Sequence, residues 1–313
     1  MIEHLVTGGA GFIGSNLAER LGVLHGGVRV LDDLSTGRRE NLAHLGERLD
    51  LHVGSVTDPT AVARALQGVR WVFHLAAVVA VEKTVAEPRL AEEVNVLGTL
   101  RVLEASRDAG VRRVVLASSA AVYGESPALP KTEAMVPEPI SPYGVSKLAG
   151  EQYVRFFARQ YGLGGVSLRF FNVFGQRQDP RSPYAAAVPR FLDALLDGHA
   201  PEIFGDGRQT RDFCPVEDVV DACVRAATHD GVGAGEVFNI GRGEETDLLE
   251  LLDGLSAAVG RSIAPRFSAP RAGDIRRSVA DVRLARERLG FVPSSSLREA
   301  LARTASWYRE NRR

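Results

Sequence analysis

Two side chains that can exchange protons, Tyr143 and Lys147, lie four residues apart in the sequence Ser-Pro-Tyr-Gly-Val-Ser-Lys. Residues i and i+4 share one face of a helix, so the spacing predicts that the phenol and the ammonium meet in one pocket. The positive charge would favour the phenolate, although bringing a tyrosine pKa from about 10 to neutrality takes about 4 kcal/mol. The pair is therefore a candidate general base that needs a second positive charge nearby, whereas an arbitrary Tyr/Lys pair usually belongs to a solvated helix face.

The composition strengthens the case for Lys147. The chain has only three lysines against 35 arginines, so a position that required only positive charge would usually carry arginine. A lysine is a compact charge that can shift its pKa and hydrogen-bond two neighbouring hydroxyls, which suits a catalytic pocket.

A glycine-rich turn follows the first apolar run of the chain. Gly9, Gly11 and Gly14 fit the pattern G-x-G-x-x-G, and Gly8, Gly11 and Gly14 fit a wider GxxGxxG. Either pattern lets backbone amides and a helix N-terminus reach a pyrophosphate. Asp32, at the end of the second apolar run, is expected to bind ribose hydroxyls and to repel a 2′-phosphate. The sequence therefore predicts a dinucleotide site that favours NAD.

Further residues are expected to contact the cofactor. Arg38 and Arg39 keep NADP open as the alternative. The residues expected around the cofactor, besides the glycines, Asp32, Tyr143 and Lys147, are Phe12, Ile13, Ser55, Val56, Ala76 and Asn95.

Apolar β-rich runs alternate with helical patterns through the first 170 residues. Nearly continuous hydrophobicity in the runs indicates strands buried on both faces, as in a parallel sheet. The predicted fold is α/β, a Rossmann-type doubly wound sheet with a smaller α/β substrate-binding C-terminal domain. The NAD-binding domain is expected over residues 1–172, rejoined by 211–240, and the substrate-binding domain over 173–313. The expected strands are 2–6, 28–31, 51–53, 71–75, 113–117 and 166–170; the expected helices are 13–24, 59–66, 90–109, 143–161, 185–196, 215–228, 246–259 and 297–308.

Composition and charge exclude several classes of function. A net charge of −1 without a basic block gives no general attraction to nucleic acid or to an anionic membrane. Neither a signal peptide nor a membrane span is recognisable. Cys214 and Cys223 are the only cysteines, which argues against a disulfide framework and for a cytoplasmic location. They lack a neighbouring His/Asp cluster or CxxC, so we expect core thiols and no metal site.

With its glycine motif and its Tyr143/Lys147 pair, the chain resembles the extended short-chain dehydrogenase/reductases, which act on nucleotide-activated sugars. The resemblance runs from residue 1 to about 310. Its further motifs are His74-Leu75-Ala76-Ala77, Asn95 and Ser118-Ser119-Ala120-Ala121-Val122-Tyr123-Gly124. By this match Ser119 would complete a Ser/Tyr/Lys catalytic triad. His74 is expected to have a structural or cofactor-lining role.

Two alanines narrow the reaction. In this superfamily, sugar 4,6-dehydratases carry an Asp-Glu pair just after the triad hydroxyl. Nucleotide-glucuronate decarboxylases carry a Glu at the second of these two positions. Here these positions are Ala120 and Ala121, so loss of water or assisted loss of CO2 would have no extra acid or base. The pattern resembles UDP-hexose 4-epimerases instead. Tyr143 would then take the proton of the sugar 4-OH while the C4 hydride passes to NAD, and the bound ketone would be reduced from its other face.

The second half of the chain resembles epimerases that accept N-acetylhexosamines. By motif, Asn172 would donate to the diphosphate, Arg211 and Arg271 would hold phosphate and ribose, and Asp274 would accept from a ribose hydroxyl. Some relatives have a bulky Tyr four residues after this acid, where the chain has Ser278. The expected substrates are UDP-Glc/UDP-Gal together with UDP-GlcNAc/UDP-GalNAc.

Three positions depart from the family pattern. Ser55 replaces an Asp that commonly contacts adenine, Val79 replaces a Lys near the nicotinamide, and Phe170 replaces a frequent Tyr. The loss of a positive charge at Val79 would leave more of the tyrosine's activation to Lys147 and NAD.

Other functions remain open. They are an NAD(P)-dependent nucleotide-sugar reductase, an epimerase of another sugar, and a non-catalytic NAD-binding sensor, although such sensors usually lack the Tyr/Lys pair.

The segment 90–109 has apolar residues on more than one face, which favours a homodimer through this helix and 143–161.

Overall fold

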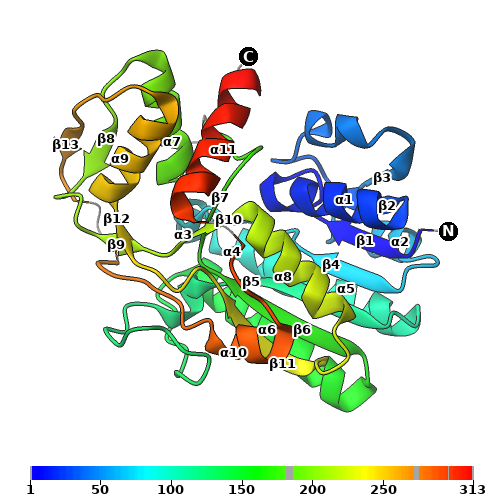
Figure 1. Ribbon diagram of the computed structural model, residues 1–313. Coiled ribbons are helices and arrows are strands. Elements are labelled where there is room, and N and C mark those ends of the chain that lie inside the picture. The colour runs from blue at the N-terminus through cyan, green and yellow to red at the C-terminus, as the bar shows by residue number, and fades with distance from the viewer. Residues whose placement is uncertain (1, 181–185, 271–274, 295, 312–313) are drawn as a thin grey trace.

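The computed structural model describes residues 2–180, 186–270, 275–294 and 296–311. Its centre is a seven-stranded parallel sheet in the order β11-β6-β5-β4-β1-β2-β3 (Figure 1). This order reverses direction between β1 and β4, so the carboxyl ends of the strands open a crevice there. The strands are β1 (His4–Thr7), β2 (Val28–Asp32), β3 (Leu49–Val53), β4 (Trp71–His74), β5 (Arg113–Ser119), β6 (Gly164–Phe170) and β11 (Ala234–Ile240).

Helices cover both faces of the sheet, and each face has its own apolar core (Figure 1). The doubly wound Rossmann-type fold predicted from the sequence is confirmed. One face carries α1 (Phe12–His25), the 3-10 segment η1 (Arg39–Arg48), α8 (Val216–Thr228) and α10 (Arg283–Leu289); the other carries α2 (Pro59–Ala65), α3 (Val81–Ala86), α4 (Pro88–Ala91), the π-helical η2 (Glu92–Leu97), α5 (Gly98–Asp108) and α6 (Pro142–Tyr161).

The six strands expected from the sequence are all present, with ends shifted by up to two residues. The seventh, β11, was not among them. Its sequence places Glu236 and Asn239 between apolar residues, so it lacks the continuous apolar run that marks a buried strand. Residues 90–109, expected as one helix, are instead split among α4, η2 and α5.

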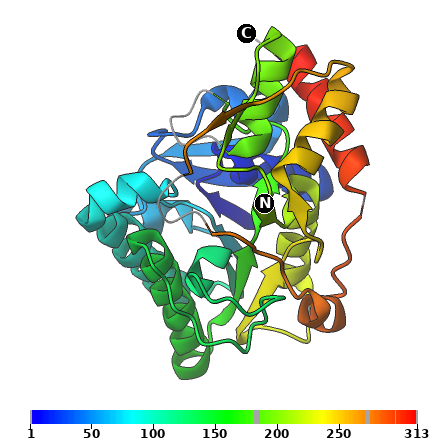
Figure 2. The same ribbon diagram turned by 90° about the vertical axis from the view of Figure 1, so that its left-hand side faces the viewer.

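The C-terminal half, whose helices lie at the upper right of Figure 2, has a separate apolar core. There α9 packs against both α7 and α11. Short strand pairs complete this half, and one of them, β7 with β10, links it to the sheet. The elements are β7 (Asn172–Phe174), α7 (Ala187–Asp197), β8 (Glu202–Phe204), β9 (Thr210–Arg211), β10 (Phe213–Pro215), β12 (Thr246–Asp247), α9 (Leu248–Val259), β13 (Arg266–Ser268) and α11 (Leu297–Asn311).

A buried ion pair fixes α6 on the sheet. Arg169 of β6 donates from Nε and Nη2 to the two oxygens of Glu151 at 2.9 and 2.7 Å, and both side chains are almost fully buried. Ser118 of β5 donates to the same carboxylate at 2.5 Å. Because a buried charge without its partner costs about 3–5 kcal/mol, this network defines the position of α6 relative to β5 and β6.

Within the described residues, the structure has no helix long and apolar enough to cross a membrane.

Candidate functional site

The glycine turn places β1 and α1 in close contact. Gly8 adopts a φ of +69°, and its carbonyl oxygen accepts from the Gly11 amide at 3.2 Å. A Cβ on Gly14 would lie 2.1 Å from the Gly8 oxygen, so only glycine fits. Gly8, Gly11 and Gly14 line the cleft, whereas a Cβ on Gly9 would meet the Val30 methyls at 2.7 Å. The wider GxxGxxG pattern therefore describes the turn, and its exposed amides suit a pyrophosphate.

Asp32 lies at the end of β2 and is 7% exposed. Its carboxylate accepts from the Ala10 amide at 2.9 Å and from the Leu34 amide at 2.8 Å, which fixes its orientation beside the glycine turn. Burial raises its pKa, and these two hydrogen bonds act in the opposite direction. A carboxylate held here can accept from ribose hydroxyls, so the residues present fit the adenosine half of NAD.

Tyr143 and Lys147 occupy the first turns of α6. Ser141 caps this helix by accepting from the Gly144 amide at 3.1 Å, and Pro142 follows at the first helical position. Lys147 donates from Nζ to the Ala117 carbonyl of β5 at 2.8 Å, and Nζ lies 5.7 Å from the centre of the Tyr143 ring. The i, i+4 spacing thus brings both groups to the same wall of the cleft.

Burial raises the pKa of Tyr143, and a hydrogen bond with Ser119 opposes this rise. The lowering expected from the charge of Lys147 is therefore not found, because burial dominates the pKa of Tyr143. Burial also lowers the pKa of Lys147 to about 8, while the charge of Glu151 raises it. A second positive charge is what this pocket still requires, and an oxidised nicotinamide ring would supply it.

Ser119 ends β5 and caps the short 3-10 helix η3 (Ala120–Tyr123) by accepting from the Ala121 amide at 3.1 Å. Its hydroxyl lines the cleft together with Tyr143 and Lys147. Ala120 and Ala121 follow directly in η3, so neither position can supply an acid or a base.

His74 and Asn95 serve the structure behind this wall. His74 is hydrogen-bonded to Thr7 at 2.7 Å and to Thr99 at 2.9 Å, and burial lowers its pKa to about 3. The imidazole is therefore neutral near pH 7 and both of its nitrogens are hydrogen-bonded, which agrees with the expected structural role. Asn95 accepts from the Val78 amide at 2.7 Å and donates to Ser146 at 3.0 Å. Its side chain connects α6 to the loop after β4, and its contact with the cofactor stays a prediction.

One cleft of about 800 Å³ extends from the glycine turn past Ser119, Tyr143 and Lys147 to the C-terminal half. The other predicted cofactor residues on its wall are Phe12, Ile13, Asp32, Ser55, Val56 and Ala76. Ser55 is hydrogen-bonded to Thr57 at 2.8 Å. The cleft therefore runs from the adenosine side through the triad to the side that would hold a substrate.

The predicted substrate residues differ in placement. Asn172 and Arg211 line the cleft, and Arg211 also donates to the Thr210 carbonyl at 2.8 Å. The amide of Ser278 donates to the Thr210 carbonyl at 3.2 Å. Among the described residues, Ser278 is not part of the cleft wall. Arg271 and Asp274 lie outside the described residues.

The cleft also contains side chains that were not predicted from the sequence. Lys83 of α3 lines it one turn after Val79, so a lysine does reach this wall. Arg190 stacks on the Phe204 ring at 5.3 Å, and Gln209 donates to the Phe204 carbonyl at 2.7 Å. The scarcity of lysine could have identified Lys83, whereas the other three depend on contacts between distant segments.

Comparisons with known proteins agree with this geometry. The model of the family described as "NAD dependent epimerase/dehydratase family" matches residues 4–241. A UDP-glucose 4-epimerase of Mycolicibacterium smegmatis is 44% identical, over 98% of this chain and 99% of its own length.

Two solved structures are similar over the whole chain. A UDP-glucose 4-epimerase of Thermotoga maritima, solved with UDP-glucose, has a TM-score of 0.93 and 40% identity, and the match covers 99% of each chain. A UDP-N-acetylglucosamine 4-epimerase of Methanobrevibacter ruminantium, solved with UDP-N-acetylmuramic acid, has a TM-score of 0.93, 35% identity and the same coverage. The glycine turn, the triad and these matches together show that the chain belongs to the NAD-dependent epimerase/dehydratase family.

Proposed function

We propose that this protein is an NAD-dependent UDP-hexose 4-epimerase, an isomerase that interconverts UDP-Glc and UDP-Gal. The observation that carries the proposal is one cleft that contains Ser119, Tyr143 and Lys147 beside the glycine turn, with alanine at both positions after Ser119. The relatives named UDP-glucose 4-epimerase support the substrate.

The residues of the chain divide the work at C4 of the hexose. Tyr143 accepts the proton of the 4-OH as the C4–H bond breaks, and Ser119 hydrogen-bonds the same oxygen. When bound beside the glycine turn, NAD would supply the hydride acceptor for oxidation at C4 and the hydride for re-reduction of the ketone. Lys147 is the charge that favours the phenolate. Since Ala120 and Ala121 offer no acid or base, the ketone formed at C4 undergoes no further elimination.

Replacing Tyr143 by Phe tests this assignment. We expect kcat for conversion of UDP-Gal to UDP-Glc, without added NAD, to fall by about 10²–10⁴-fold because the base is lost. The NAD content of the purified variant should stay that of the wild type, since Tyr143→Phe removes one hydroxyl.

The wild-type arm separates the alternatives. A reductase would consume added NAD(P)H in step with product, and a sensor would retain NAD without forming UDP-Glc. Full activity in Tyr143→Phe would contradict the role of the phenol.

The charge of Lys147 predicts the alkaline side of the pH profile. Its pKa of about 8 means that the ammonium is present below this pH and is lost above it. We expect kcat/KM to decline as the pH rises through about 8, because neutral lysine no longer favours the phenolate. In Lys147→Arg, where the charge persists to above pH 12, the decline should disappear even if kcat/KM is lower throughout. An unchanged alkaline decline in this variant would assign it to another group.

We also propose that UDP-GlcNAc and UDP-GalNAc are substrates. A serine at position 278 leaves more room than the Tyr of some family members, and a UDP-N-acetylglucosamine 4-epimerase is among the similar structures. Asn172, Arg211, Arg271 and Asp274 are proposed to hold the diphosphate and the ribose.

Replacing Ser278 by Tyr should therefore reduce kcat/KM for UDP-GalNAc by at least about tenfold, while kcat/KM for UDP-Gal changes less. Ser278→Ala is the matched control, because it keeps the space and removes the hydroxyl. Intact turnover of UDP-GalNAc by Ser278→Tyr would show that this position does not limit the size of the sugar.

We propose a homodimer through the segment 90–109, which spans α4, η2 and α5, and through residues 143–161 of α6. Leu97, Val145 and Phe156 expose 46–49% of their surface on η2 and α6, which pack against each other. Such apolar side chains are typical of a covered face. Light scattering at micromolar concentration should give twice the chain mass, and Phe156→Glu should reduce it toward the monomer. A monomeric wild type would exclude the dimer.

We further propose a cytoplasmic location. Both cysteines are buried free thiols, which suits a reducing compartment.

We also propose a division into an NAD-binding domain over 1–172, rejoined by 211–240, and a substrate-binding domain over 173–313. The return of β11 to the central sheet supports the rejoined segment. Fractionation that finds the protein outside the cytosol, or proteolysis that cuts elsewhere first, would contradict these assignments.

A further inference from the structure

The backbone of Arg38 lies next to Asp32, the acid that is expected to bind the ribose. The Arg38 amide donates to the Ala10 carbonyl at 3.0 Å, and the Ala10 amide donates to Asp32 at 2.9 Å. The preceding Gly37 is so close that a Cβ there would lie 2.8 Å from Asp32 Oδ1. A cation in this place could reach a 2′-phosphate, which is how NADP is accommodated in folds of this type.

The guanidinium of Arg38, however, is engaged by a carboxylate from another part of the chain. Its Nη2 donates to Asp179, and the side chains are 48% and 34% exposed. Asp179 belongs to the segment 175–180, which follows β7 and leads toward the C-terminal half. The pair therefore lies between the adenosine side of the cleft and the segment that joins the two halves.

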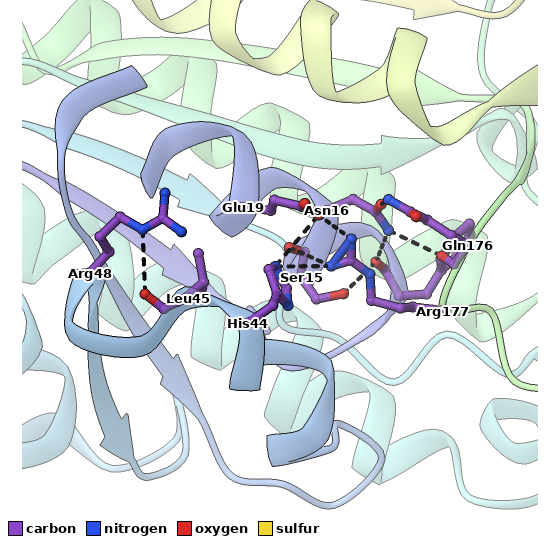
Figure 3. Close-up of polar contacts among 9 residues, drawn as sticks. Ser15, Asn16, Glu19, His44, Leu45, Arg48, Gln176 and Arg177 are labelled. Carbon is purple, nitrogen blue, oxygen red and sulfur yellow. Dashed lines mark hydrogen bonds and ion pairs between the residues drawn. The ribbon is translucent and has the colours of Figure 1, made fainter. Parts of the chain in front are cut away.

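The segment 175–180 is fastened to α1 by further polar contacts (Figure 3). Gln176 donates from Nε2 to Asn16 Oδ1 at 2.7 Å, and Asn16 returns a bond to the Gln176 carbonyl at 3.2 Å. The side chain of Arg177 is 8% exposed and donates to Glu19. On the other side, the hydroxyl of Tyr308 donates to the carbonyl of Gln178. These contacts hold the backbone on both sides of Asp179, so its carboxylate is delivered to Arg38 by a fixed segment.

We propose that Asp179 is a cofactor-specificity residue, which excludes NADP by occupying Arg38. To bind a 2′-phosphate, Arg38 has to leave Asp179, and the released carboxylate then adds a negative charge to that of Asp32. NAD makes neither demand, because it has a hydroxyl at this position. The arginine that could have admitted NADP is thereby turned into part of the NAD site. The inference rests on the dinucleotide site alone and is independent of the sugar.

The experiment compares the dissociation constants of NAD⁺ and NADP⁺ for cofactor-stripped protein, measured by calorimetry. In Asp179→Asn we expect the preference for NAD⁺ to fall by about tenfold, which corresponds to about 1.4 kcal/mol, with NAD⁺ affinity nearly unchanged. A released arginine forms charge-assisted bonds to phosphate, so the gain should appear in NADP⁺ binding. The double variant Arg38→Gln/Asp179→Asn should lose this gain.

Asp230→Asn is the matched control, because it removes the carboxylate of an exposed pair with Arg112 whose arginine is 49% exposed. It should leave the preference unchanged. The same comparison is made in an Asp32→Asn background, where repulsion by Asp32 no longer masks an effect. An unchanged preference in both backgrounds, or a gain that persists without Arg38, would overturn the proposal. Loss of epimerase activity with intact NAD⁺ selectivity would contradict the proposed function and leave this inference in place.

Discussion

The contact between the glycine turn and the start of α1 is the constraint on which the rest of the site depends. With 2.1 Å between the Gly8 oxygen and the position of a Cβ on Gly14, α1 can approach β1 only because that Cβ is missing. This approach directs the helix N-terminus into the crevice where the strand order reverses. It also brings Ala10 to Asp32 and Asn16 to the segment after β7. A single steric condition thus positions the glycine turn, Asp32 and the link to the C-terminal half.

The other end of the cleft depends on burial of charge. Lys147 is 6% exposed and donates to a strand carbonyl, so its ammonium is stabilised mainly by fixed dipoles and by nearby Glu151. Glu151 is in turn held by Arg169 and Ser118. Along α6, residues 143, 147 and 151 follow one face at intervals of four, from the reacting phenol to the ion pair in the core. Tyr143 and Lys147 are thereby connected along α6 to the buried ion pair of Glu151 and Arg169.

Local rules were sufficient for the fold and for part of the site. Repeated βα units, the glycine spacing and the i, i+4 pair predicted the doubly wound sheet and placed Asp32 at a strand end and Tyr143 and Lys147 on one helix, whereas Ser119 came from the resemblance to a known family. They could not place β11, since its polar residues interrupt the apolar pattern. Nor could they place Lys83, Arg190 or Phe204 on the cleft, because these contacts join segments far apart in the chain. Burial has the largest effect on the pKa of Tyr143, which a residue pattern does not reveal.

The position of β11 has a consequence for how the molecule can be divided. Strand β6 lies between β5 and β11, and α8 covers the apolar core on one face of the sheet. Both β11 and α8 come from the chain after residue 210. A fragment ending at residue 172 would therefore leave β6 as an open, apolar edge and uncover that core, and such edges recruit other strands. The sheet is built from two separate parts of the sequence, so residues 1–172 cannot be excised as a working module.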